Sequence, residues 1–344
     1  MKTYKNLYPQ IYDFQNLLKS YYQARRCKSE KRYIIEFEWN LEKNLFYIQN
    51  KLKDCNYQFG QYQSFYVSDP KKRLIFAAPF QDRIVHHALC NVIEPIFDKR
   101  FIYDSYACRR NKGTHKAVFR LKKFMRSFGD DKFYVFKADI KKYFPSINKD
   151  ILFQLIKKKI SDQDTLLLIR AVIDSLDDKD GIPIGNLTSQ LFANIYLNEL
   201  DQFVKHYLKV KYYCRYVDDF VLLHQERSQL KIWRAEIKEF LKNRLKLELH
   251  PQKQEIFPVK IGIDFLGYHI FTSHILVRQS TARRFFCRLK SGQMPNQSIY
   301  SYLGHFKFAD SFGLMKKVNR IYAERYTNFS QNLRVNHLDL SNSK

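Results

Sequence analysis

Two short apolar segments separated by three residues constrain the fold of this chain more than any other feature. Residues 212–216 and 220–223 are rich in Tyr, Val and Leu, and Val217, Asp218 and Asp219 lie between them. Such segments favour strands, so the pattern predicts a β-hairpin with carboxylates at its tip. Residues 132–139 alternate and are rich in Phe, Tyr and Val, which predicts another strand.

Helices are predicted on both sides of these strands. Apolar side chains recur at spacings of three and four residues in 188–207 and in 230–245, and a further helix is predicted over 82–97. Asn148 is a suitable cap for the helix that follows it. Strands separated by helices predict an α+β fold with a small antiparallel sheet.

Three aspartates form the candidate chemical site: Asp139 at a strand end, and Asp218 and Asp219 at the hairpin tip. Neighbouring carboxylates repel one another, and a divalent cation removes that penalty. Oxygen ligands suit Mg²⁺, and two such ions roughly 4 Å apart stabilise the attacking and leaving oxygens of a phosphoryl transfer. An isolated Asp-Asp pair is more often a solvated acidic turn, so the surrounding sequence must decide.

Three blocks around these aspartates resemble reverse transcriptases. Residues 136–144 resemble the first catalytic motif of that family, residues 185–197 resemble its template-facing loop and helix, and residues 216–219 match its tyrosine–x–aspartate–aspartate hairpin. The four-residue match alone is weak, but three blocks in the family order are a specific signal.

Four further blocks resemble the fingers motif, the motif that follows it, the late palm lysine motif and the primer-grip hairpin, at residues 73–86, 106–115, 247–253 and 265–268. The resemblance covers most of the chain. It implies a right-hand polymerase, with fingers and palm in residues 1–272 and a short basic helical thumb in residues 273–344.

The resemblance also implies roles for individual residues. Asp139 and Asp218 would bind two Mg²⁺ ions, for which Mn²⁺ is a substitute, Asp219 would assist, and the Ile140 carbonyl would complete one coordination sphere. Arg73 and Arg109 would clamp the triphosphate of the incoming dNTP, since a guanidinium matches phosphate oxygens in pairs. The alternative for each arginine is an ordinary surface position.

Other dNTP and primer contacts follow from the same resemblance. Lys253 would neutralise or protonate the leaving pyrophosphate, with an exposed lysine as the alternative. Phe144 would be the steric gate that excludes a ribose 2′-OH, with a core aromatic as the alternative. Leu266 and Gly267 would form the primer grip.

The charge of the chain indicates a polyanionic partner. Lys and Arg number 60 against 34 Asp and Glu, a formal net charge of +26. Cations that meet phosphates release condensed counterions, so we expect binding to template RNA and to the RNA–DNA duplex. Residues 275–344 carry twelve Lys and Arg against three Asp and Glu, which predicts a thumb that grips the duplex backbone.

The sequence has few signals of export or of further domains. Residues 1–12 lack the apolar core of a signal peptide, and we expect no membrane span. Six cysteines without a C-x-x-C pair fit a reducing compartment. We therefore expect a cytoplasmic protein of bacterial or phage origin, with neither an RNase H domain nor a metal-dependent endonuclease.

Two departures point to a subfamily. Group II intron polymerases usually carry Gln-Gly and Ser-Pro where this chain has Ile184-Gly185 and Ser189-Gln190. This loop and residues 301–307 resemble reverse transcriptases of diversity-generating retroelements. Those enzymes copy a template-repeat RNA with frequent errors at adenines and work with a small basic accessory variability protein. Ile184 lacks a hydrogen-bonding group near the templating base, which would favour such errors.

Two alternatives remain open at this point. The chain could be an intron-derived or phage-defence reverse transcriptase. It could also be a catalytically inactive RNA-binding protein with a polymerase fold, since fold does not fix function. The intact set of Asp139, Asp218 and Asp219 argues against an inactive protein, and DNA synthesis on primed poly(rA) discriminates between them.

Overall fold

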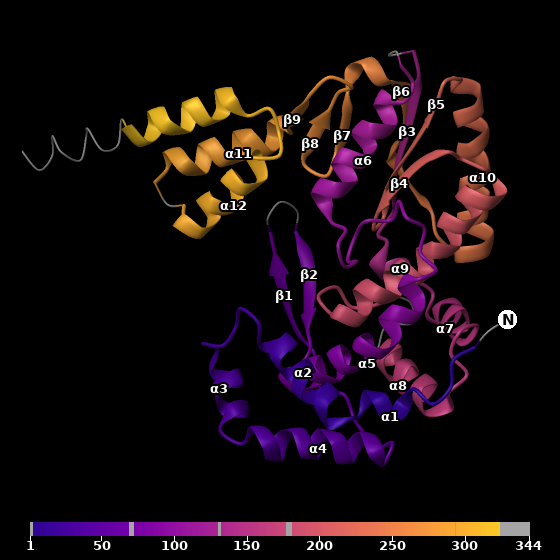
Figure 1. The fold of residues 1–344 in the computed structure, drawn as a ribbon, viewed down its shortest axis with the longest axis vertical. Coiled ribbons are helices and arrows are strands. Elements are labelled where there is room, and N and C mark those ends of the chain that lie inside the picture. The colour runs from indigo at the N-terminus through magenta and orange to yellow at the C-terminus, as the bar shows by residue number, and fades with distance from the viewer. Residues whose placement is uncertain (1–2, 69–71, 130–131, 177–180, 293, 324–344) are drawn as a thin grey trace, which may run out of the picture. The chain divides into compact units, whose positions relative to one another are not determined.

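The computed structural model forms two compact units (Figure 1). The first comprises Met1–Ala117 and Tyr134–Phe257, and the second comprises Val118–Phe133 and Pro258–Lys344. The domain boundary predicted after residue 272 stays a prediction, and the second compact unit begins before it. The structure describes residues 3–68, 72–129, 132–176, 181–292 and 294–323.

The first unit is centred on a four-stranded sheet with the strand order β4-β5-β3-β6. Strand β5 pairs antiparallel with both β4 and β3, which confirms the predicted hairpin and the predicted strand before it. Helix α10 (Arg227–Leu245) packs against β3 and β5, and its buried residues include Leu230, Ile237 and Leu241. The strands are β3 (Tyr134–Ile140), β4 (Tyr212–Tyr216), β5 (Asp219–His224) and β6 (Leu249–Pro258).

Helix α9 (Leu187–Gln202) is the central helix of this unit, and it continues into the π-helical turn η2 (Phe203–Tyr207). It packs against α5 (Phe80–Asp98), α7 (Lys149–Lys157) and α10. The predicted cap of α7 is confirmed, because the Asn148 side chain accepts a hydrogen bond of 3.0 Å from the Ile151 N–H. Helix α8 (Gln163–Asp174) packs on α7.

The remaining elements of the first unit are N-terminal. Helix α2 packs against both α4 and α5. Strands β1 and β2 form a separate antiparallel ribbon, and β1 is exposed along its whole length. These elements are α1 (Tyr8–Ile11), α2 (Phe14–Arg25), α3 (Arg32–Glu38), α4 (Leu41–Lys53), β1 (Gln63–Val67) and β2 (Arg73–Ala77).

The second unit combines a small sheet with helices. The sheet has the order β7-β8-β9, and the helices bury Phe285, Phe306 and Val318 in a core of their own. Helix α6 begins in the first unit and ends in the second. The elements are α6 (Thr114–Arg126), η3 (Val259–Ile261), β7 (Ile263–Phe265), β8 (Tyr268–Ile270), β9 (Ile275–Val277), α11 (Gln279–Lys290), α12 (Asn296–Phe306) and helical residues 312–323.

Both units mix helices with small antiparallel sheets, so the predicted α+β class is confirmed. Part of the predicted thumb, residues 324–344, lies outside the described residues. Within the part of the chain that is described, none of the helices combines the length and the apolar character needed to cross a membrane.

Candidate active site

The hairpin of β4 and β5 carries two of the three predicted aspartates at its tip. Tyr216 pairs with Asp219 and closes a loop of two residues, Val217 and Asp218. Val217 has a φ of 54°, an uncommon conformation for a β-branched residue and one that costs of order 1–3 kcal/mol. The backbone of this tip is therefore strained and must be held by its surroundings.

The third aspartate is brought to the same place by strand pairing. Asp139 on β3 lies opposite Asp219 on β5. The Ile140 N–H donates a hydrogen bond of 3.3 Å to the Asp218 carbonyl, which ties the strand end to the loop. Three carboxylates predicted from distant segments thus lie at one end of the sheet.

Asp139 and Asp218 interact directly. Burial, and then the charge of Asp139, raise the pKa of Asp218 to about 6, while the Lys253 ammonium acts in the opposite direction. Lys253 on β6 forms an ion pair with Asp139. Two half-buried carboxylates that repel one another, with a cation already drawn to one of them, form a set of oxygens suited to a hard cation.

Asp219 forms an ion pair of its own. Its Oδ2 lies 3.7 Å from the Lys137 Nζ on the neighbouring strand. Among the described residues, no group of three or more His, Cys, Asp or Glu is placed to hold a metal ion. Mg²⁺ is commonly bound by one or two carboxylates together with waters and substrate phosphates, so the pair of Asp139 and Asp218 fits such an ion. The identity and number of ions, and the Ile140 carbonyl as a ligand, stay predictions.

A buried ion pair stabilises the hairpin of β4 and β5. Sequence reasoning missed this pair. Arg215 on β4 and Asp201 on α9 are both fully buried and make two hydrogen bonds of 2.6 and 2.7 Å. Arg215 also donates to the Val217 carbonyl at 2.8 Å and to the Ser105 hydroxyl at 3.1 Å. Burial by itself lowers the pKa of Arg215, but the charge of Asp201 and its hydrogen bonds outweigh burial and hold the pKa above its ordinary value. Arg215 therefore fixes the strained loop that carries Asp218.

Arg109 does not reach toward the carboxylates in this structure. Its guanidinium donates to Asp98 at 2.6 Å and to the carbonyls of Ile102 and Ser105 at 2.7 and 2.9 Å. Only 8% of its side chain is exposed. This geometry gives Arg109 a structural role in its own loop. Its predicted contact with the triphosphate stays untested, and these bonds argue against it.

The other residues that we predict to contact the dNTP are at least partly exposed to solvent. Arg73 is exposed at the start of β2. Phe144 begins the short helix η1 (Phe144–Ser146), is half-buried and lies against Tyr143 with 5.5 Å between ring centroids. Tyr143 itself is buried and donates to the Ala193 carbonyl. Phe144 is thus held at the end of β3 without being buried in the core, and its role as a gate stays a prediction.

The predicted template loop is docked on β2. The Phe76 N–H donates a hydrogen bond of 2.9 Å to the Ile184 carbonyl, and Ile184 is half-buried. Gly185 has a φ of 126°, and a Cβ there would lie 3.0 Å from the Phe76 carbonyl oxygen, so only glycine suits this position. Gln190 is exposed in the first turn of α9. Their roles in template reading stay predictions.

The predicted primer grip lies in the second unit. Leu266 and Gly267 connect β7 and β8, and both have positive φ, 51° and 88°, as in a type I′ turn. The Gly267 carbonyl accepts a hydrogen bond of 2.9 Å from the Arg278 N–H. The two residues therefore form a fixed turn, and contact with a primer stays a prediction.

Comparison with known proteins decides the family. The family model "Reverse transcriptase (RNA-dependent DNA polymerase)" matches residues 68–270, more than half of the chain. The chain belongs to the reverse transcriptase family. This match includes the carboxylates on β3 and β5, the template loop and the primer-grip turn, so it confirms the family that the motifs indicated.

Curated relatives of this reverse transcriptase include group II intron proteins. Protein YkfC of Escherichia coli is 28% identical over 244 residues, covering 59% of this chain and 64% of the relative. The group II intron-encoded protein LtrA of Lactococcus lactis is 26% identical over 303 residues, covering 67% of this chain and 50% of the relative. The chain thus spans between half and two thirds of the length of these relatives.

A solved structure supports the fold of this reverse transcriptase. The apo telomerase of Candida tropicalis aligns with a TM-score of 0.51 and 13% identity, covering 65% of this chain and 49% of that chain. At this identity the likeness concerns the fold alone. It confirms the right-hand polymerase fold that the motifs implied.

Proposed function

We propose that this chain synthesises DNA on an RNA template by two-metal phosphoryl transfer. The observation that carries the proposal is the meeting of the Asp139 and Asp218 carboxylates at the end of β3, beside the Lys253 ammonium. Such a pair has no evident structural purpose, because burial and the repulsion from Asp139 raise the pKa of Asp218 and disfavour its charged form.

Each residue then has a chemical task. Asp139 and Asp218 would hold Mg²⁺, or Mn²⁺ in its place, and share it with the phosphates of a dNTP. Bound ions of this kind neutralise the attacking and leaving oxygens of an in-line displacement. Lys253, which forms an ion pair with Asp139, would exchange that bond for one with the leaving pyrophosphate. Template RNA and RNA–DNA duplex are the partners that this reaction requires.

Asp218→Asn tests this proposal. The substitution keeps the shape of the side chain and removes one anionic ligand. Loss of partners outside the coordination sphere already costs roughly 10–100-fold in activity, so we expect a loss of at least about hundredfold. Incorporation of dTTP on oligo(dT)-primed poly(rA) with Mg²⁺ is the measurement.

The matched control is Asp164→Asn, which removes an exposed carboxylate on α8. Its activity should equal that of the unaltered chain. Absence of synthesis by the unaltered, folded chain would favour the inactive RNA-binding alternative. Equal activity of Asp218→Asn and Asp164→Asn would refute the assignment of the carboxylates.

The finer proposal is that the polymerase belongs to a diversity-generating retroelement. It would make adenine-mutagenic cDNA from a template-repeat RNA, with a small basic accessory variability protein as partner. The supporting observation is Ile184, which is half-buried at the template loop and has no side-chain donor or acceptor. A Gln there could hydrogen-bond and hold a template base in register.

Ile184→Gln tests the finer proposal. Loss of an orienting hydrogen bond of about 1 kcal/mol costs several-fold in selectivity. An A–T pair has two hydrogen bonds and should suffer more than G–C. We therefore expect Ile184→Gln to lower misincorporation opposite template adenine more than opposite other bases. Sequencing of cDNA that both proteins make on one RNA template provides the error rates.

The second candidate is an intron-derived reverse transcriptase, and the similarity to the group II intron-encoded protein favours it. The same sequencing experiment separates the two. An error rate that is even across the four template bases, and unchanged by Ile184→Gln, would favour the intron-derived candidate. An excess at adenine would favour the diversity-generating candidate.

A further inference from the structure

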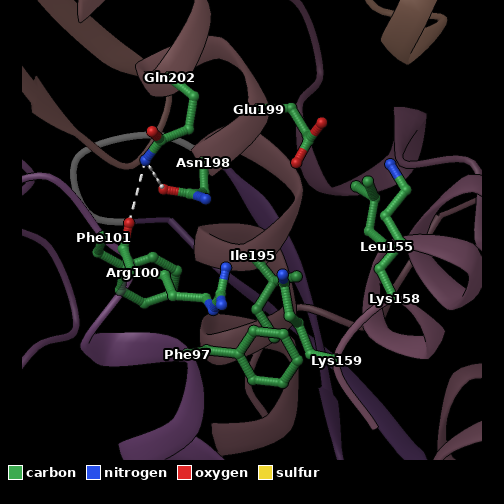
Figure 2. Close-up of a pocket in the computed structure, with 10 residues that line it drawn as sticks. All are labelled: Phe97, Arg100, Phe101, Leu155, Lys158, Lys159, Ile195, Asn198, Glu199 and Gln202. Atoms are coloured by element: carbon green, nitrogen blue, oxygen red, sulfur yellow. Dashed lines mark hydrogen bonds between the residues drawn. The ribbon is translucent and has the colours of Figure 1, made fainter. Parts of the chain in front are cut away.

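A cavity of about 380 Å³ lies in the first unit among α5, α7 and α9, on side chains that the candidate active site does not use (Figure 2). Its volume is within the range of roughly 300–1,000 Å³ that small-molecule sites occupy. Apolar and polar side chains share its wall. These are Phe97, Arg100, Phe101, Leu155, Lys158, Lys159, Ile195, Asn198, Glu199 and Gln202.

Lys159 is the unusual member of this wall. The residue is 7% exposed, and its Nζ has no hydrogen-bond acceptor among the described residues. Its backbone is fixed, because the Lys159 carbonyl accepts a hydrogen bond of 2.8 Å from the Tyr4 N–H. A buried ammonium without an acceptor is costly, so an ion that accepts from it would be bound favourably.

Two further cations surround the same space. Arg100 and Lys158 line the cavity, and Glu199 is the one acidic residue among the described residues of its wall. Figure 2 shows the end groups of Arg100 and Lys159 close together, with Glu199 on the helix above them. Burial lowers the pKa of Lys159, and the charges of Arg100 and Lys158 lower it further against the effect of Glu199. The wall therefore has an excess of positive charge that an anion would offset.

The rest of the wall suits a flat apolar group. Phe97 and Phe101 are buried, and Leu155 and Ile195 complete the apolar part. The Gln202 amide donates to the Arg100 carbonyl at 3.0 Å and to the Asn198 side-chain oxygen at 3.1 Å, which fixes the polar rim. Nucleobases stack on aromatic side chains while their phosphates meet cations, and this cavity offers both.

The cavity is separate from the catalytic hairpin. Helix α9 presents Asn194 and Asp201, seven residues apart, to Arg215 of the hairpin strand. The cavity residues Ile195, Asn198 and Gln202 are three and four positions apart, so they share one face of the helix. This face differs from the face that carries Asn194 and Asp201. A ligand here would not compete directly with a dNTP at the carboxylates.

We propose that this cavity binds one phosphate-bearing nucleotide, with the phosphate at Lys159 and Arg100 and the base against the apolar wall. The nucleotide comes either from single-stranded RNA or from the free nucleoside monophosphate pool. The excess of basic residues over the whole chain increases the local concentration of both.

Thermal unfolding of the full chain tests the proposal, with EDTA present so that metal-dependent nucleotide binding at the carboxylates is excluded. AMP at constant ionic strength should raise the Tm in a saturable manner. Lys159→Met should weaken this binding about tenfold, the scale of one charge-assisted hydrogen bond. Lys157→Met is the matched control, because Lys157 is the exposed last residue of α7, two positions before Lys159, and does not line the cavity.

Binding of a fluorescent five-nucleotide RNA, followed by anisotropy, identifies the source. A Tm increase with AMP that needs a higher AMP concentration in Lys159→Met than in Lys157→Met assigns a free-nucleotide site. A difference between Lys159→Met and Lys157→Met for the RNA alone assigns an RNA contact. If Lys159→Met does not fold, Arg100→Gln at the exposed rim replaces it. Equal behaviour of the cavity variants and Lys157→Met with both ligands would overturn the proposal, whether or not the chain synthesises DNA.

Discussion

Arg215→Met is the most informative change outside the carboxylates. Arg215 and Asp201 are both fully buried and joined by two short hydrogen bonds. Removal of one member of such a pair leaves an uncompensated buried charge, which costs roughly 3–5 kcal/mol. A domain is usually stable by about 5–15 kcal/mol, so the single variant should lose a large fraction of its stability.

The double variant Arg215→Met with Asp201→Leu separates stability from positioning. It removes both charges, so its stability should return to within about 2 kcal/mol of the unaltered chain. The costs that remain include the Tyr213 hydroxyl, which loses its bond of 2.8 Å to Asp201, and the Ser105 hydroxyl, which loses its bond of 3.1 Å from Arg215. The bond from Arg215 to the Val217 carbonyl is not restored. Loss of a hydrogen bond from a charged group costs about 1.5–3 kcal/mol, which corresponds to roughly ten- to hundredfold in rate.

Two measurements check this reasoning. Denaturant unfolding gives the free energy of unfolding for the single and double variants. Single-turnover primer extension then gives the rate of DNA synthesis for the stable double variant. Synthesis at the unaltered rate by a stable double variant would refute the positioning role of Arg215. A single variant that loses less than about 1 kcal/mol would refute the treatment of the pair as buried.

Three further changes test individual assignments. The folded-state pKa of Asp218 is about 6, above the ordinary 3.8, so the folded chain binds this proton more tightly than the unfolded chain does. The resulting stability is fully present below pH 3.8 and is lost as pH rises through about 6. In EDTA, the free energy of unfolding should therefore fall over this interval, and equal pH slopes for Asp218→Asn and the unaltered chain would contradict this. Phe144→Ala should admit ribonucleotides, and unchanged discrimination between dNTP and rNTP in single-turnover assays would count against the gate. Arg109→Lys should lower the free energy of unfolding by about 1–3 kcal/mol, because the bonds of Arg109 to Asp98 and to two carbonyls are lost. A variant that keeps its stability but has a raised KM for dNTP would instead support the triphosphate clamp.

The sequence predicted the parts of the site that local patterns define. The hairpin follows from two apolar strands with a charged tip, and Asp139 follows from the end of an alternating strand. Pairing of β3 with β5 then requires little more than the antiparallel register, which places Asp139 opposite Asp219. These are short-range regularities, so one sequence suffices to find them.

The contacts that sequence reasoning did not anticipate have no local pattern. Arg109 is held by a carboxylate eleven residues away and by two backbone carbonyls, and carbonyls are present at every position of any sequence. The cavity around Lys159 requires three helices from separate parts of the chain. A usable signal existed for Arg215, because a charged residue within an apolar strand is costly to bury without a partner. The identity of that partner required the structure.

Helix α9 shows why such partners are hidden in the sequence. Its spacing of apolar residues predicted a helix correctly, but the helix is buried on most of its surface by α5, α7 and α10. A helix buried all round has no single apolar stripe, so its pattern cannot indicate which face meets which neighbour. Its polar residues carry that information instead: Asp201 pairs with Arg215 of β4, while Glu199 lines the cavity. Each buried polar residue on such a helix requires a partner, and its spacing along the helix indicates the face on which that partner lies.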